Sequence, residues 1–175
     1  MSLNNIPAGE NFPEDLYVII EIPAYSYSIK YEINKKNGAL FVDRFLTTSM
    51  VYPCNYGYIN QTLSLDGDPL DTLVITPQPL QSKSVILCRP LGMLNMIDDS
   101  GEDFKLIAVP HNKLTSEYDS IQDIKDLPQE ICDKINHFFN HYKDLEKNKW
   151  TKILGWKNLD QTKQELIRSY ERAQK

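Results

Sequence analysis

The sequence has no long hydrophobic run and few cysteines. Its longest apolar stretch, Leu16 to Ile20, is much shorter than the ~20 residues that a membrane-spanning helix needs. The three cysteines, Cys54, Cys88 and Cys132, are too widely spaced to form a Cys-x-x-Cys pair and suit a reducing compartment. The first five residues provide neither the basic start nor the apolar segment of a signal peptide. We therefore expect a cytoplasmic protein with no membrane contact and no disulfide framework.

A glycine-rich phosphate-binding loop is also missing. No Gly-x-Gly-x-x-Gly segment occurs, so the sequence does not support a doubly wound nucleotide-binding fold. The chain has only seven glycines against ten prolines and ten tyrosines, which favours a β-rich body with many turns over a helical bundle. No linker or repeat divides the 175 residues, so we expect a single domain over residues 1–175.

The negative charge is concentrated in one stretch. Between Asp66 and Asp103 there are seven acidic and two basic residues, so the whole net charge of −5 lies there. Such a region repels phosphate backbones, and a general nucleic-acid surface is not expected. It also repels itself unless folding separates the carboxylates or cations neutralise them.

The first two thirds of the chain contain the predicted strands. Between residues 25 and 33, tyrosine and isoleucine alternate with polar residues, which predicts one strand with an apolar and a polar face. Asn37-Gly38 predicts a hairpin turn after it, and Asp98-Asp99-Ser100-Gly101 a second tight turn. Further strands are expected over residues 16–22, 39–44, 72–75, 84–88, 91–97 and 104–109.

The last third of the chain changes to a helical period. Apolar residues recur from Ile131 to Tyr142 at spacings of three and four, and Pro128 suits the first turn of that helix. A second helix is expected from about Asp160, a suitable cap, to Tyr170. Strands followed by helices predict an α+β fold: a small closed five-stranded β-barrel of OB-like type, with extra strands and two main helices.

The segment Asp66-Gly67-Asp68-Pro69-Leu70-Asp71 places three carboxylates within six residues. Because Gly67 and Pro69 restrict the backbone to a turn, the three side chains can converge on a hard cation such as Mg²⁺, Mn²⁺ or Ca²⁺. A polar surface turn is the simpler alternative. An EF-hand is excluded, since Asp71 stands where that loop requires glycine.

A second acidic group follows at residues 98–103. In the strand that leaves this turn, Asp103 and Lys105 are two residues apart and therefore share a face, as Lys30 and Glu32 do in their strand. Each pair taken alone could be an exposed salt bridge of little energetic value. Two acidic turns accompanied by basic strand residues and by the tyrosines near Tyr52 point instead to a shared site.

Taken together, these motifs resemble family I soluble inorganic pyrophosphatases, particularly the short bacterial type, from about Leu16 to Trp156. Two positions depart from the family pattern: Thr72 replaces a small or aliphatic residue, and Asp99 replaces glutamate. The motifs that carry the resemblance are Glu21-Ile22-Pro23-Ala24, Lys30/Glu32, Asp43-Arg44, Tyr52-Pro53-x-Asn55-Tyr56-Gly57, Asp66 to Asp71, Asp98-x-x-Gly101-Glu102-Asp103-x-Lys105 and His141-Tyr142-Lys143.

The resemblance implies Mg²⁺-dependent hydrolysis of inorganic pyrophosphate to two orthophosphates, with Mn²⁺ or other hard divalent ions as substitutes. By similarity, Asp68 is the general base and takes a proton from a water that bridges two metal ions. The implied metal ligands are Glu32, Asp66, Asp71, Asp98 and Asp103. The implied substrate-binding residues are Lys30, Arg44, Tyr56, Tyr142 and Lys143. The residues that match supporting positions beside them are Glu21, Tyr52 and Lys105.

Two further expectations concern partners. Bacterial members of the family form hexamers, so the resemblance implies a homo-oligomer, and neither nucleic acid nor membrane is expected as a partner. The competing interpretation is a non-catalytic OB-like module that binds oligonucleotides or oligosaccharides through exposed tyrosines such as Tyr27 and Tyr31. The localised negative charge argues against the nucleic-acid version of that module.

Overall fold

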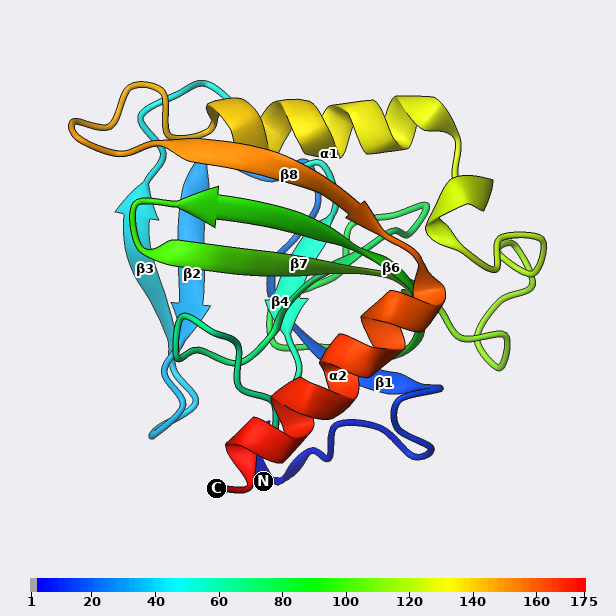
Figure 1. The fold of residues 1–175 in the computed structure, drawn as a ribbon. Helices are drawn as coiled ribbons and strands as arrows, with labels where there is room; N and C mark the ends of the chain where they lie inside the picture. The colour runs from blue at the N-terminus through cyan, green and yellow to red at the C-terminus, as the bar shows by residue number, and fades with distance from the viewer. Residues whose placement is uncertain (1–2) are drawn as a thin grey trace.

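The computed structural model describes residues 3–175, whose elements are shown in Figure 1. The helices are α1 (Gln129–His141) and α2 (Leu159–Ala173), with short 3-10 turns at Leu3–Asn5 and Ile124–Asp126. The strands are β1 (Leu16–Ile22), β2 (Ile29–Ile33), β3 (Leu40–Phe45), β4 (Asn55–Tyr58), β5 (Asp71–Val74), β6 (Val85–Asp98), β7 (Gly101–Pro110) and β8 (Thr151–Lys157).

Five of the strands close into a ring. β1 pairs with β4, β4 with β5, β5 with β7 and β7 with β6, and β6 pairs back to β1. The β5–β7 pair is parallel and the other four are antiparallel. β8 pairs with the second half of β6, while β2 and β3 form a separate hairpin, at the left of Figure 1. This arrangement confirms the expected OB-like α+β fold with five closed strands, additional strands and two helices.

Two strand predictions are wrong in detail. The strand predicted over residues 25–33 begins only at Ile29, because Tyr25 adopts a left-handed φ of 55° and donates its backbone N–H to Tyr52 instead of a strand partner. The two strands expected over residues 84–97 are one, β6. Pro90 and Gly92 produce a register shift in its pairing with β7 and do not end it.

Two strands carry signals too weak to predict. β4 has only four residues, all of them buried, so it shows no alternation between polar and apolar positions. β8 contains Gly155 and two lysines and continues the sheet only because β6 extends past the ring. Both are specified by their neighbours more than by their own sequences.

The two helices begin close to their predicted starts. Pro128 stands at the N-cap of α1, and α2 is capped by Asn158, not by Asp160 as predicted. The Asn158 side chain accepts a hydrogen bond from the backbone N–H of Gln161, and the Gln161 side chain accepts one from the backbone N–H of Asn158, which completes a capping box. No helix within residues 3–175 has the length and apolar character needed to cross a bilayer.

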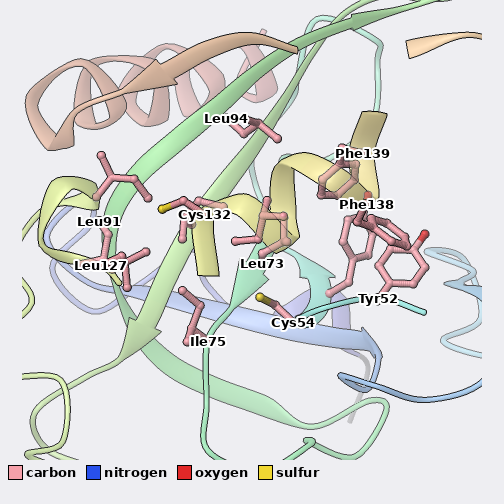
Figure 2. Close-up of a cluster of buried hydrophobic side chains, with 14 of the residues drawn as sticks. Tyr52, Cys54, Leu73, Ile75, Leu91, Leu94, Leu127, Cys132, Phe138 and Phe139 are labelled. Atoms are coloured by element: carbon pink, nitrogen blue, oxygen red, sulfur yellow. The ribbon is translucent and has the colours of Figure 1, made fainter. Parts of the chain in front are cut away.

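The larger hydrophobic core lies between α1 and the sheet. Figure 2 shows Cys132, Phe138 and Phe139 of α1 gathered with Leu73 of β5 and Leu94 of β6. These α1 residues lie on one stripe of the helix, so the helix buries a single apolar face.

The cysteines belong to the hydrophobic interior. Cys54, Cys88 and Cys132 are all buried and free, in agreement with the absence of a disulfide framework. Burial raises the pKa of the Cys54 thiol to about 12, so this side chain remains a neutral thiol near pH 7.

The second helix, α2, anchors the loop that follows β4. Ser169 of α2 accepts a backbone hydrogen bond from Leu63 at 2.9 Å, and Arg172 donates from Nε to the carbonyl of Leu63 at 2.8 Å. The guanidinium of Arg172 is held in turn by the buried carboxylate of Glu165 at 2.7 Å. The C-terminal helix therefore fixes the start of the loop that carries Asp66 and Asp68.

We expect Phe138→Ala to lower the free energy of unfolding by about 3–5 kcal/mol, because it removes a buried ring and leaves a cavity. The Phe138 ring lies 4.6 Å from that of Tyr52 and 5.1 Å from that of Tyr142, measured between centroids. Urea unfolding followed by circular dichroism measures the change. Phe45→Ala, at a residue that is 71% exposed, is the matched control and should change stability by no more than about 0.5 kcal/mol. Equal losses in the two variants would contradict this account of the core.

Candidate active site

One cavity of about 260 Å³, here called the main cavity, brings most of the predicted site residues together. Its walls come from the β2–β3 hairpin, the end of α1, the β6–β7 turn and the loop between β4 and β5. The residues that line it are Lys30, Arg44, Tyr52, Tyr56, Asp66, Asp68, Asp71, Asp98, Ser100, Glu102, Asp103, Lys105, Phe139, Tyr142 and Lys143. Carboxylates that are distant in sequence therefore share one space.

The two remaining predicted residues, Glu21 and Glu32, line a smaller neighbouring cavity of about 70 Å³, here called the side cavity. Lys30, Tyr56, Asp68 and Asp71 line both cavities, so the two cavities lie next to each other. Every residue proposed from the sequence thus lies around one composite site.

The loop between β4 and β5 presents its carboxylates through a local turn. The Asp66 carboxylate accepts a hydrogen bond from the backbone N–H of Asp68 at 3.0 Å, and the backbone carbonyl of Asp68 accepts one from the N–H of Ser64 at 2.7 Å. Gly67, between them, has a φ of 93°, a left-handed conformation that side chains disfavour. The predicted turn is confirmed, and it lets both carboxylates reach the main cavity.

The acidic wall of the main cavity consists of the carboxylates from the β4–β5 loop, β5, the β6–β7 turn and β7. Lys105 lies among these carboxylates. Its Nζ donates to Asp71 at 2.6 Å and to Asp103 at 2.8 Å, and it also contacts the hydroxyl of Tyr56 at 3.3 Å. The side chains of Lys105 and Asp103 are only 5% and 10% exposed, so the pair predicted from their shared face is a buried one. Burial favours the neutral amine, but Asp71 and Asp103 outweigh it and raise the pKa of Lys105 well above its ordinary value.

The β6–β7 turn forms a second part of the acidic wall. Asp98 accepts hydrogen bonds from the backbone of Ser100 at 2.7 Å and from Lys143 Nζ at 2.8 Å. Burial acts to raise the pKa of Asp98, but these two hydrogen bonds outweigh it and hold that pKa below its usual value. Asp99 pairs with Lys149 at 2.6 Å, so both aspartates tie the turn to the segment after α1.

The basic wall comes from the β2–β3 hairpin. Lys30 and Arg44 stand opposite each other in the register of the two strands, and both line the main cavity. Lys30 Nζ lies 3.3 Å from Asp43, and Arg44 Nε lies 3.6 Å from Glu146. Two cationic side chains of this hairpin therefore line the same cavity as the acidic turns.

Three tyrosines, Tyr52, Tyr56 and Tyr142, also line the main cavity. The Tyr52 and Tyr56 rings lie 5.0 Å apart, and Tyr142 stacks on Phe138 directly after α1. Burial raises the pKa of both Tyr52 and Tyr56, so these phenols remain protonated and can donate hydrogen bonds.

Comparison with known proteins decides the family. The family described as "Inorganic pyrophosphatase" matches residues 18–174. The chain is 64% identical to the inorganic pyrophosphatase of Escherichia coli (strain K12) over 173 residues, which cover 99% of this chain and 98% of that protein. The chain belongs to the inorganic pyrophosphatase family.

Solved structures of pyrophosphatases agree with this assignment. The Coxiella burnetii structure superimposes with a TM-score of 0.92 at 48% identity, covering 95% of this chain and 99% of that one. The Thermus thermophilus structure superimposes with a TM-score of 0.94 at 38% identity and full coverage of both chains. The ring of five strands is thus the pyrophosphatase fold.

The donor set of this pyrophosphatase suits a hard divalent cation, because its ligand atoms are carboxylate oxygens. Burial raises the pKa of Asp66 and of Asp103, so both carboxylates are poorly solvated when charged and gain from nearby positive charge. In the present geometry, no three His, Cys, Asp or Glu side chains within residues 3–175 are grouped to hold an ion. The positive charge between Asp71 and Asp103 is that of Lys105.

Sequence reasoning missed two charged residues that support the pyrophosphatase site. Lys35 pairs with the buried carboxylate of Glu21 at 3.2 Å and lies over the Tyr58 ring, and Glu146 faces Arg44. Neither belongs to a motif with recognisable spacing, so only their placement in space identifies them. Thr72, one of the two departures from the family pattern, is fully buried and donates its hydroxyl to the carbonyl of Leu70 at 3.4 Å.

We expect Lys105→Met to lower the free energy of unfolding by about 3–5 kcal/mol in buffer containing a chelator, since it leaves Asp71 and Asp103 without their buried partner. Mg²⁺ added to the variant should restore part of that loss. Chemical unfolding with and without Mg²⁺ measures both effects. Lys149→Met, which breaks a more exposed pair, should cost at most about 1 kcal/mol. Indistinguishable losses would show that Lys105 does not balance the acidic wall.

Proposed function

We propose that this pyrophosphatase hydrolyses inorganic pyrophosphate to two orthophosphates in the main cavity. The observation that carries the proposal is that acidic and basic side chains from distant parts of the chain line one small cavity. Its volume of about 260 Å³ lies below the roughly 300–1,000 Å³ typical of pockets for drug-sized ligands, which suits a compact polyanion.

The acidic wall would bind the divalent cations. Asp66, Asp71 and Asp103 are the proposed principal ligands, and Asp98 and Glu32 would contribute to further ions. Mg²⁺ is the proposed ion, with Mn²⁺ as a substitute, because both prefer carboxylate oxygens. When bound, such ions neutralise phosphate charge and lower the pKa of the attacking water.

The basic wall would bind the phosphates. Arg44 can donate two parallel hydrogen bonds to one phosphate, whereas Lys30 and Lys143 act as mobile point charges. Tyr56 and Tyr142 would donate their hydroxyls to phosphate oxygens. Lys143 is held by Asp98 in this structure, so it already lies at the border between the two walls.

Asp68 is the proposed general base. It lines both cavities, and its carboxylate has no side-chain ion pair within the described residues that would prevent it from accepting a proton. In the reaction, the water oxygen forms a bond to one phosphorus, the bond from that phosphorus to the bridging oxygen breaks, and the water proton passes to Asp68. Lys105, Glu21 and Tyr52 would keep the neighbouring groups in place and need not contact the reacting atoms.

Other expectations from the sequence stay predictions. The three buried free thiols are consistent with a cytoplasmic location, and a homo-oligomer follows from the resemblance alone. A single domain over residues 1–175 is likewise a prediction. An oligonucleotide-binding module is disfavoured because the main cavity is lined by six carboxylates, which would repel a phosphate backbone in the absence of cations.

Release of orthophosphate from pyrophosphate in the presence of Mg²⁺ tests the function directly. We expect steady release with Mg²⁺, loss of release when the ion is chelated, and recovery when Mg²⁺ is restored. A colorimetric phosphate assay measures it, with a known pyrophosphatase as positive control. Pyrophosphate that stays intact while the control works would overturn the proposal.

We expect Asp68→Asn to reduce kcat by about 10²–10⁴-fold, because the amide cannot accept the proton. Binding of Mn²⁺, measured by calorimetry, should be largely preserved, since Asp68 is not one of the proposed principal ligands. Asp119→Asn, at an exposed position outside both cavities, is the matched control and should retain the parental rate. Parental activity in the Asp68 variant would remove this residue from its proposed role.

A further inference from the structure

Arg44, which lines the main cavity, forms an ion pair with Glu146. Arg44 Nε and Glu146 Oε1 face each other at 3.6 Å, and both atoms are buried from solvent. Neither atom has a hydrogen-bond partner among residues 3–175. A buried N–H and a buried carboxylate oxygen are both costly when unpaired, so each is the natural partner of the other.

The two residues reach this contact from elements distant in sequence. Arg44 belongs to β3, and Glu146 follows α1 in the same segment as Lys143 and Lys149, which pair with Asp98 and Asp99. The segment is thus tied to the acidic turn, and through Glu146 it also faces the basic hairpin. Glu146 does not line the main cavity, whereas Arg44 does, so the carboxylate stands behind the guanidinium.

Arg44 has a competing acidic neighbour. Its Nη1 lies 4.0 Å from Asp43, the carboxylate that also pairs with Lys30 at 3.3 Å. Without Glu146, Asp43 would be the acidic partner that remains for Arg44 among the described residues. Asp43 attracts Nη1, at the other end of the guanidinium from Nε. The orientation of the phosphate-facing nitrogens therefore depends on which carboxylate holds the side chain.

We propose that Glu146 is a positioning residue for substrate binding: it holds Arg44 through Nε, so that the terminal guanidinium nitrogens, of which Nη1 lies 4.0 Å from Asp43, can bind a phosphate. This inference rests on the proposed function. Glu146 does not touch the reacting atoms. The Glu146 side chain is only 14% exposed, and its carboxylate fixes one edge of the Arg44 guanidinium, so that little rotational freedom is lost when a phosphate binds.

Steady-state kinetics on pyrophosphate with saturating Mg²⁺ test this inference. We expect Glu146→Ala to raise KM by about tenfold while kcat changes by less than about threefold, because an interaction equal in ground and transition states is lost. Glu146→Gln keeps an oxygen acceptor and should give a smaller increase in KM. Glu14→Gln, which removes the charge from a surface pair with Lys163, is the control and should leave both constants unchanged.

A double-mutant cycle separates positioning from a general structural effect. If Glu146 acts through Arg44, the double variant Arg44→Met with Glu146→Ala should have the KM of Arg44→Met alone, within about twofold. Additive increases, a KM unchanged in both Glu146 variants, or a loss confined to kcat would each overturn the inference. If Glu146→Ala does not fold, the KM of Glu146→Gln, alone and combined with Arg44→Met, tests the inference. A parental protein without activity would instead reject the proposed function, so the two failures are distinguishable.

Discussion

The structure depends on one electrostatic constraint, the gathering of many carboxylates around a small and partly buried space. Burial and the neighbouring carboxylates raise the pKa of Asp66 and of Asp103, so the ionised forms of these two groups gain from nearby positive charge. Lys105 supplies that charge at the centre of the acidic wall, with its amino group between Asp71 and Asp103. The same requirement makes the site receptive to divalent cations, and through them to a polyanion that bare carboxylates would repel.

The fold meets this constraint by joining segments that are distant in sequence. The parallel β5–β7 pair brings Asp71 beside the strand that carries Asp103 and Lys105, and α2 anchors the loop of Asp66 and Asp68 through Arg172. The basic hairpin adds Lys30 and Arg44 to the cavity lining, and the segment after α1 adds Lys143. The acidic and the basic side chains therefore come from different elements, and ion pairs such as Lys143–Asp98 connect them.

Local sequence was enough to predict those features whose physical cause is local. The span of β1, the β6–β7 turn, the apolar stripe of α1 and the shared face of Asp103 and Lys105 follow from periodicity and turn chemistry, and the structure confirms them. Sequence-based prediction failed for features that are determined by contacts between residues distant in sequence. Strands β4 and β8 exist because neighbouring strands pair with them, and the partners Lys35 and Glu146 lie in no motif, so only the folded chain reveals them. Metal-ligand and catalytic roles came from family resemblance and await measurement.

The most direct test of the central claim is anomalous diffraction from crystals of the protein grown with Mn²⁺ in place of Mg²⁺. The account predicts anomalous peaks inside the main cavity, within coordination distance of oxygens of Asp66, Asp71 and Asp103, and their disappearance when these three residues are replaced by asparagine. Peaks confined to the outer surface, with the cavity free of metal at saturating Mn²⁺, would contradict it.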